Sequence, residues 1–180
     1  IGTEELLKDA SLRDSQGIRH YCIVSSGRRA SDRDLDSLCE SIRSVHEKTG
    51  ICVCTSLGLL DEAQFGRLKE AGVVRIHNNL ETSARYFPQL CTSHTYEEKI
   101  ATIRAARRVG LEVCSGGIIG VGETMEDRID MALTLRELDV QSVPVNMLDP
   151  VPGTPFGETP VLPAEEVRRV IALFRFLLPR

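Results

Sequence analysis

Short runs rich in valine and isoleucine alternate with longer amphipathic stretches along the chain, and this alternation most restricts the folds it can adopt. The candidate strands, each bounded by Gly, Pro, Asn or Ser, are 20–26, 50–56, 73–79, 111–119 and 142–148. One helix is expected near the start of the chain, and the further candidate helices cover 32–48, 61–71, 95–109, 124–138 and 163–178. Strand, helix and strand repeating at roughly thirty-residue intervals predict βαβ units and a parallel sheet.

Composition and charge exclude several classes of protein. With 42% hydrophobic and 27% charged residues, the chain is neither disordered nor fibrous. The 22 basic and 26 acidic residues give a net charge of −4 without a basic stripe, so we expect no nucleic-acid or anionic-membrane partner. No apolar run approaches the ~20 residues of a membrane span, and no signal peptide opens the chain, so we expect a cytoplasmic protein. Without a linker or compositional break, residues 1–180 are predicted to form one domain.

Polar residues inside the candidate strands favour one of two architectures. Five successive strands each carry one in the middle or C-terminal half: Cys22, Cys54, Asn79, Cys114 and Asn146. In a β/α barrel, inward side chains near the strand C-termini meet in one cavity. In a doubly wound sheet, the crevice forms only at a switch point. The sequence therefore favours a partial TIM-type (β/α) barrel of parallel strands with outer helices, lacking the first strand and the last strands of the full eight.

The cysteines divide by position. No two form a C-x-x-C pair, and without a secretory signal they are not expected to form a disulfide framework. Cys39 lies on the apolar stripe of a helix and is predicted to be a core residue, while Cys91 lies in a loop. Cys22, Cys54 and Cys114 come from three different strands. They are either three unconnected core thiols or the ligands of one metal, and soft thiolates suit an iron–sulfur cluster.

Two loops and one strand could bind a ligand. The segment LEVCSGGIIGVGE places four glycines within seven residues, which either lets a ligand approach the backbone or makes a tight turn. In HNNLETS, Asn79 could hold a polar ring or a ribose and Glu81 a ribose diol, although such residues also form simple turns. Asn146 lies among apolar residues and must find a polar partner.

Together these segments resemble the biotin synthases, a family of radical S-adenosylmethionine (SAM) enzymes. The resemblance runs from about residue 15 onward, through YCIVSSGR, CTSLG, HNNLETS, CTSHTYEEKI, VCSGGIIGVGET and SVPVNMLDPVPGTP. It implies a β/α barrel and a step of biotin biosynthesis, the insertion of sulfur into dethiobiotin by a transferase. In this family a 4Fe–4S cluster and SAM generate a 5′-deoxyadenosyl radical, and a 2Fe–2S cluster supplies the sulfur. It also implies a flavodoxin- or ferredoxin-type reductant and a homodimer.

The resemblance further implies roles for individual residues. Three cysteines match the metal ligands of the 2Fe–2S cluster: Cys22, Cys54 and Cys114. Two asparagines match residues that contact dethiobiotin: Asn79 and Asn146. The residues that match SAM-binding positions are Asn79, Glu81, Lys99, Gly117, Ile119, Gly120 and Glu123.

Two departures from the family pattern bear on activity. The C-x-x-x-C-x-x-C motif that holds the 4Fe–4S cluster is absent and would lie before Ile1, so we expect this polypeptide alone not to cleave SAM. Arg180 follows Pro179 too early to match the family's arginine ligand and is not assigned. One alternative is a related radical SAM enzyme without sulfur insertion, of the hydrogenase-maturation type, against which the three strand cysteines argue. Another is an inactive ligand-binding remnant, because a barrel without its first strand leaves unpaired edges.

Overall fold

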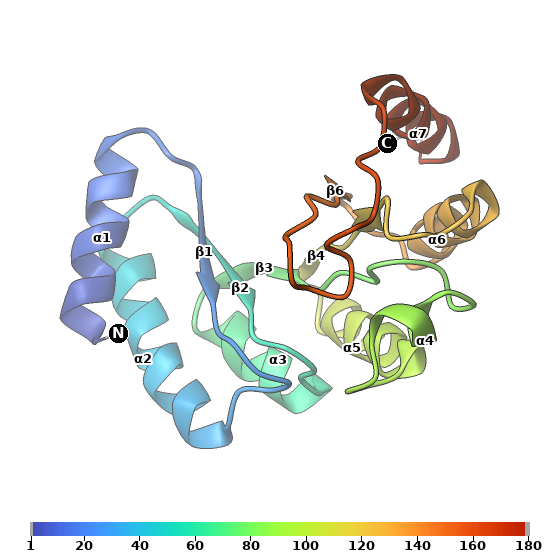
Figure 1. The fold of residues 1–180 in the computed structure, drawn as a ribbon. Helices are drawn as coiled ribbons and strands as arrows, with labels where there is room; N and C mark the ends of the chain where they lie inside the picture. The colour runs from blue at the N-terminus through green and yellow to red at the C-terminus, as the bar shows by residue number, and fades with distance from the viewer. Residues whose placement is uncertain (1, 179–180) are drawn as a thin grey trace. The chain divides into compact units, whose positions relative to one another are not determined.

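The computed structural model describes residues 2–178, so Pro179 and Arg180 lie outside it. The chain forms two compact units (Figure 1). The first unit comprises the residues up to 78 together with 101–113, and the second comprises 79–100 and the residues from 114 onward. That all 180 residues form one domain stays a prediction.

The first unit is built on a sheet with the strand order β1-β2-β3-β4. Its strands are β1 (His20–Val24), β2 (Cys52–Ser56), β3 (Val73–His77) and β4 (Glu112–Cys114), of which β4 continues into the second unit. β1 pairs in parallel with β2, and β2 pairs in parallel with β3. The helices are α1 (Thr3–Ser15), α2 (Asp32–Lys48), α3 (Glu62–Glu70) and the second half of α5 (Tyr96–Arg108).

Helix α2 shows why the periodic pattern folds as expected. Ser31 caps the helix, its side chain accepting a hydrogen bond from the backbone N–H of Asp34. The apolar stripe on one face is buried, as expected for residues spaced three and four apart. Cys39 belongs to that stripe and is only 3% exposed, which confirms it as a core thiol, and burial raises the pKa of this thiol.

The second unit contains a two-stranded parallel sheet and three complete helices. The strands are β5 (Gly117–Ile119) and β6 (Val145–Met147), with Ile118 opposite Asn146. The helices are α4 (Phe87–Leu90), α6 (Met125–Glu137) and α7 (Ala164–Leu177), together with the first turn of α5. The core of this unit includes Phe87, Ile119, Met131, Leu135 and Phe174, all buried.

One predicted element is wrong in detail. The segment 111–119 was expected to be a single strand, but it divides into β4 and β5 at Ser115 and Gly116. The backbone of Gly116 bonds to the segment that follows β3, and a Cβ on this glycine would collide with the Pro144 carbonyl group. The chain therefore leaves regular strand geometry there. The short helix α4 was not predicted, because four residues are too few to show a helical period.

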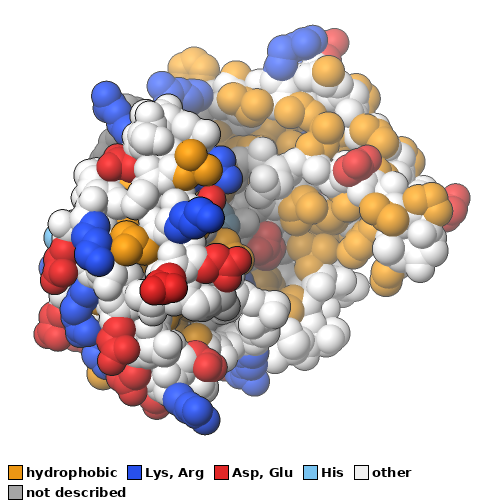
Figure 2. Space-filling model, turned by 90° about the vertical axis from the view of Figure 1, so that its left-hand side faces the viewer, with side chains coloured by type: hydrophobic (Ala, Val, Ile, Leu, Met, Phe, Trp, Pro, Cys, Tyr) orange, Lys and Arg blue, Asp and Glu red, His pale blue; other side chains and the backbone are white. Residues whose placement is uncertain are grey.

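The surface agrees with the mixed charge of the sequence. On the face drawn in Figure 2, Lys and Arg side chains are interspersed with Asp and Glu, and hydrophobic side chains gather on another part of it. Among residues 2–178, no helix has both the length and the apolar character needed to cross a membrane.

Candidate functional site

The segment after β3 adds to the start of β5 and positions three predicted site residues. Asn79 Oδ1 accepts a hydrogen bond from the Gly116 N–H at 3.0 Å. The Glu81 N–H donates to the Gly116 carbonyl oxygen at 3.1 Å, and the Ile118 N–H donates to the Glu81 carbonyl oxygen at 2.9 Å. Glu81 adopts φ of 70°, a left-handed conformation uncommon for a residue other than glycine and concentrated at functional sites.

Gly117 is required where this segment meets β5. A Cβ at this position would collide with the Glu81 carbonyl oxygen and the Met131 sulfur. The glycine thus lets the backbone of Glu81 lie directly against β5, which explains one of the four clustered glycines.

Glu81 and Lys99 are both half-buried in the second unit, and each charge influences the other. Burial raises the pKa of Glu81, although the positive charge of Lys99 and a hydrogen bond from Asn79 act against the rise. Burial likewise lowers the pKa of Lys99, although the Glu81 charge opposes it. The structure therefore brings together Asn79, Glu81 and Lys99, all three predicted to contact SAM.

The glycine-containing strip 117–123 is fixed in its second half by a buried carboxylate. Glu123 Oε1 lies 2.8 Å from the Gly120 N–H, and Glu123 Oε2 lies 2.8 Å from the Val121 N–H, so both amides donate to it. From outside the strip, the Tyr86 hydroxyl donates to the Val121 carbonyl oxygen at 2.7 Å. Because both Glu123 oxygens are occupied by the strip itself, Glu123 shapes the loop that carries Ile119 and Gly120.

Asp127 joins the segment after Glu81 to the start of α6. Its carboxylate accepts hydrogen bonds from the Ser83 hydroxyl at 2.6 Å and from the Thr124 N–H at 2.8 Å, and Arg85 lies 2.9 Å away. Burial acts to raise the pKa of Asp127, but these hydrogen bonds and the Arg85 charge outweigh it and lower the pKa to about 2. Sequence reasoning did not find this network, although Thr124 followed by Asp127 is a capping-box pattern.

Asn146 is placed beside the same strip. Its side-chain amide donates to the Gly117 carbonyl oxygen at 3.4 Å, and the residue is exposed. The amide therefore has the polar partner that its place among apolar residues demanded. An exposed amide next to Gly117 is accessible to a ligand.

Two of the three predicted cluster ligands lie side by side. Cys22 and Cys54 are register partners on β1 and β2, so they share one face of the sheet with their strands about 4.8 Å apart. Cys114 ends β4 in the second unit, where its thiol lies 3.5 Å from Ser142 Oγ. Within either unit alone, no three His, Cys, Asp or Glu side chains of residues 2–178 are grouped to hold a metal ion. The paired thiols are suitable donors for iron, and the full ligand set stays a prediction.

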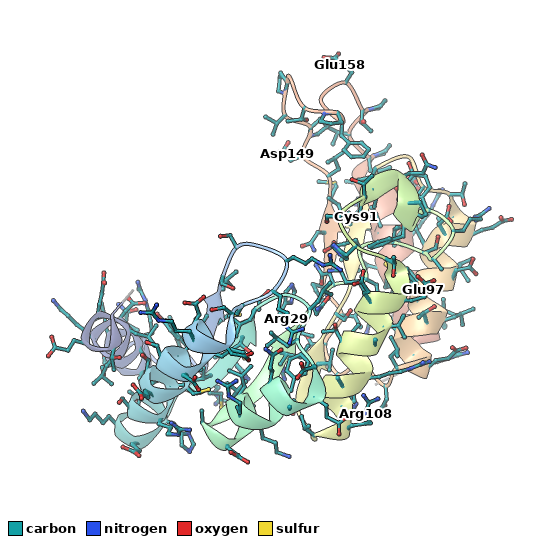
Figure 3. All side chains as sticks on the ribbon, turned by 90° about the horizontal axis from the view of Figure 1, so that it is seen from below. Arg29, Cys91, Glu97, Arg108, Asp149 and Glu158 are labelled. Atoms are coloured by element: carbon teal, nitrogen blue, oxygen red, sulfur yellow. The ribbon has the colours of Figure 1, made fainter. Side chains whose placement is uncertain are left out.

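Cys91 has chemistry that its sequence position did not reveal. It follows α4 (Figure 3), and its Sγ lies 3.3 Å from His94 Nδ1 and 3.4 Å from Ser93 Oγ. Burial acts to raise the pKa of this thiol, but hydrogen bonds from Ser93 and His94 and the nearby Lys99 charge lower it overall. In the sequence, the only indication of this environment is that Ser93 and His94 follow Cys91 closely.

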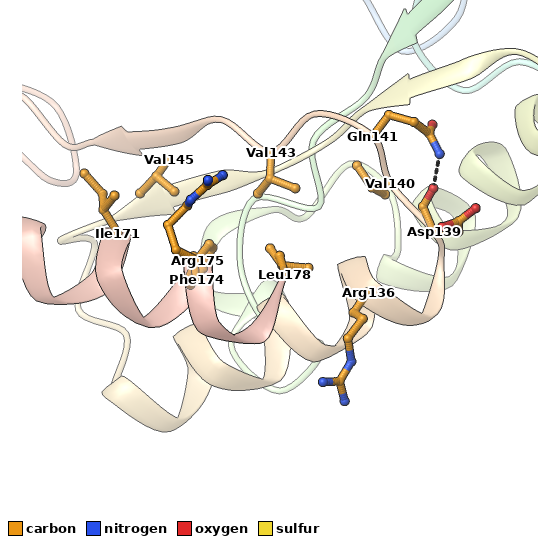
Figure 4. Close-up of a pocket in the computed structure, with 10 residues that line it drawn as sticks. All are labelled: Arg136, Asp139, Val140, Gln141, Val143, Val145, Ile171, Phe174, Arg175 and Leu178. Atoms are coloured by element: carbon orange, nitrogen blue, oxygen red, sulfur yellow. Dashed lines mark hydrogen bonds between the residues drawn. The ribbon is translucent and has the colours of Figure 1, made fainter. Parts of the chain in front are cut away.

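A cavity of about 200 Å³ lies elsewhere in the second unit (Figure 4). Apolar residues of α7, of β6 and of the loop before β6 line it, together with Arg136 and Arg175. None of its lining residues is among the predicted site residues.

Comparison with known proteins identifies the class. Residues 2–135 match the family model of the Radical SAM superfamily, and the chain belongs to that superfamily. Residues 144–180 match the Biotin and Thiamin Synthesis associated domain. The chain is 51% identical over 99% of its length to the protein named biotin synthase of Akkermansia muciniphila, and 48% identical over 99% to that of Clostridium botulinum strain Langeland. It covers 56% of each, so it spans about half the length of the curated relatives it matches.

Solved structures support the fold. Methylornithine synthase (PylB) superimposes with a TM-score of 0.86 at 21% identity, covering 98% of this chain and 52% of that protein. The FeFe-hydrogenase maturase HydG from Carboxydothermus hydrogenoformans superimposes with a TM-score of 0.83 at 18% identity, covering 99% and 44%. At these identities the likeness shows the fold alone. It confirms the predicted α/β fold of parallel strands, part of a barrel like that of radical SAM enzymes.

Proposed function

We propose that this chain is the central part of a biotin synthase, which inserts sulfur into dethiobiotin. The observation that carries the proposal is identity of about one half to proteins of that name over 99% of the chain, including the C-terminal segment typical of biotin and thiamin synthesis. Membership of the Radical SAM superfamily supplies the reaction class.

The second unit offers groups suited to the parts of SAM. Glu81, whose backbone is left-handed, would offer its carboxylate to accept hydrogen bonds from ribose hydroxyls. Lys99 offers a positive charge for the carboxylate of the methionine moiety. The glycine-containing strip 117–123 would bring its backbone close to the flat adenine ring. Asn79 bonds to both Gly116 and Glu81, so it orients the acidic side chain in addition to any contact with ligand.

Dethiobiotin would be recognised by amide groups. The cyclic urea of this substrate has both N–H donors and a carbonyl acceptor, and a side-chain amide matches both. Asn146 is exposed beside Gly117 and can offer its carbonyl oxygen and its amino group to the urea. Asn79 can contribute from the segment after β3.

Iron–sulfur clusters would complete the enzyme. Cys22, Cys54 and Cys114 would hold the 2Fe–2S cluster, and the 4Fe–4S cluster would be held by residues outside these 180. When bound, the clusters and SAM would supply the organic radical and the sulfur atom, while the protein supplies binding and orientation. We further propose a cytoplasmic homodimer that receives electrons from a flavodoxin- or ferredoxin-type protein.

The test is a pair of assays on the full-length protein, reconstituted with iron and sulfide without oxygen. Biotin formed from dethiobiotin and 5′-deoxyadenosine released from SAM are measured in parallel. We expect Cys22→Ala, Cys54→Ala and Cys114→Ala to abolish biotin formation and to retain SAM cleavage, whereas the core variant Cys39→Ala keeps both. Biotin formation at the wild-type rate by all three variants would overturn the proposed cluster site. Absence of biotin formation by the wild type would overturn the proposed reaction.

A further inference from the structure

A buried arginine lies behind the strip that is proposed to contact SAM. Arg128, on α6, donates from Nε to Glu123 Oε1 at 2.7 Å, and its Nη1 donates to Glu166 Oε1 on α7 at 2.6 Å. The side chains of Arg128 and Glu123 are 4% and 1% exposed, whereas that of Glu166 is 38% exposed. One guanidinium thus joins the strip to the C-terminal helix.

The geometry of Glu123 explains why the arginine matters to the strip. The carboxylate accepts hydrogen bonds from the Gly120 and Val121 amides, which turns both N–H groups inward. Gly120 has φ of 88°, so the backbone there needs a left-handed residue and an outside constraint to keep its path. A buried carboxylate without a positive partner is strongly disfavoured, and it would move toward water. That movement would release the two amides.

We propose that Arg128 is a positioning residue for the adenosyl ligand. Its guanidinium keeps the Glu123 carboxylate in place, Glu123 holds the strip in its binding conformation, and Glu166 links this arrangement to α7. The C-terminal segment that matches the Biotin and Thiamin Synthesis associated domain therefore contributes to SAM binding without touching SAM. This inference rests on the proposed function, because it takes the strip to be the SAM-binding loop.

The variants separate positioning from simple stability. Arg128→Gln removes the positive charge, and Arg128→Lys keeps the charge but cannot serve Glu123 and Glu166 with a planar fork. Glu166→Gln weakens the interaction between Arg128 and Glu166. Because the Glu166 side chain is partly exposed, this substitution is not expected to prevent folding. Arg136→Gln is the matched control, because this arginine is exposed on the same helix.

The experiment measures two quantities on the full-length reconstituted protein: amide hydrogen exchange of Gly120 and Val121, and the KM for SAM beside the KM for dethiobiotin. We expect Arg128→Gln to accelerate exchange at both amides at least tenfold and to raise the KM for SAM at least tenfold, with the KM for dethiobiotin within twofold. Arg128→Lys should give values between those of the wild type and Arg128→Gln. Glu166→Gln should raise both the exchange rate and the KM for SAM twofold to fivefold. The control should leave both unchanged.

The contrary outcomes are distinct. If Arg128→Gln fails to fold, Glu166→Gln decides alone: unchanged exchange or an unchanged KM for SAM overturns the inference. If exchange accelerates in either variant while the KM for SAM stays within twofold, Arg128 stabilises the strip through Glu123 but does not position the ligand, and the inference is wrong. If the wild type neither binds nor cleaves SAM, the proposed function fails. Exchange at Gly120 and Val121 still shows in that case whether Arg128 and Glu123 hold the strip in place.

Discussion

Replacing Asp127 by asparagine tests how the second unit holds the segment after β3 against α6. The carboxylate receives hydrogen bonds from Ser83 and Thr124 and lies 2.9 Å from the guanidinium of Arg85. Asparagine has nearly the same shape, but it lacks the charge, and its amino group would face donors instead of acceptors. The substitution therefore removes the electrostatic part of the network with little change in packing.

The expected loss follows from the pKa of this group. A fall from the ordinary value of 3.8 to about 2 corresponds to at most about 2.5 kcal/mol of stabilisation of the folded unit. Because the Arg85 side chain is 59% exposed, solvent screening reduces the expected value to about 1–2 kcal/mol. The folded-state pKa lies below the unfolded one, so this stabilisation is complete above about pH 4. It is lost as the pH falls through about 2, with roughly half remaining at pH 3.

The assay is urea-induced unfolding of the wild type and of Asp127→Asn at pH 7 and at pH 3. The free energy of unfolding should differ by about 1–2 kcal/mol at pH 7 and by about half of that at pH 3. Glu126→Gln is the control, because this neighbouring carboxylate is 82% exposed and should change stability by less than about 0.5 kcal/mol. A difference that does not shrink at pH 3, or an effect no larger than that of the control, would refute the reasoning.

Three further outcomes follow from the site. Gly117→Ala should destabilise the protein by about 1–3 kcal/mol in urea unfolding, because the new methyl group meets the Glu81 backbone and the Met131 sulfur. The control Gly66→Ala, in open space on α3, should stabilise the protein by about 0.5–1 kcal/mol. Equal effects of the two substitutions would contradict the close contact at Gly117. Iodoacetamide at pH 7 should modify Cys91, whose pKa is lowered, at least tenfold faster than Cys39, whose pKa is raised, as followed by peptide mass spectrometry, and equal rates would refute it. Because the pKa of Lys99 is lowered, SAM affinity measured between pH 7 and pH 10 should decline at a lower pH in the wild type than in Lys99→Arg, and identical profiles would exclude this lysine from the site.

Much of the fold could be predicted because it depends on local patterns. The apolar stripe of 32–48 and the cap at Ser31 are short-range signals, and the helix forms within those bounds. The division of 111–119 was missed because it depends on distant partners. Asn79 and Pro144 engage the backbone of Gly116 from well outside the segment, while the flanking valine and isoleucine residues favour continuous strand.

The candidate site was predicted only in part, for a similar reason. Residue type and position suffice to nominate Glu81, since a carboxylate at a strand end suits a polar ligand, whereas Lys99 was nominated only by the resemblance to the biotin synthases. The left-handed backbone of Glu81 and the bond between Arg128 and Glu166 depend on tertiary packing that no local pattern encodes. The lowered pKa of Cys91 is likewise a balance of burial against several hydrogen bonds and charges.

We propose that thiols from separate strands of this chain hold the 2Fe–2S cluster of a biotin synthase. Mössbauer spectroscopy of the full-length protein, reconstituted with ⁵⁷Fe, tests it directly. We predict that the wild type and Cys39→Ala show the 2Fe–2S signal and that Cys22→Ala, Cys54→Ala and Cys114→Ala lose it while the 4Fe–4S signal remains. Retention of the 2Fe–2S signal by all three of those variants would contradict the account.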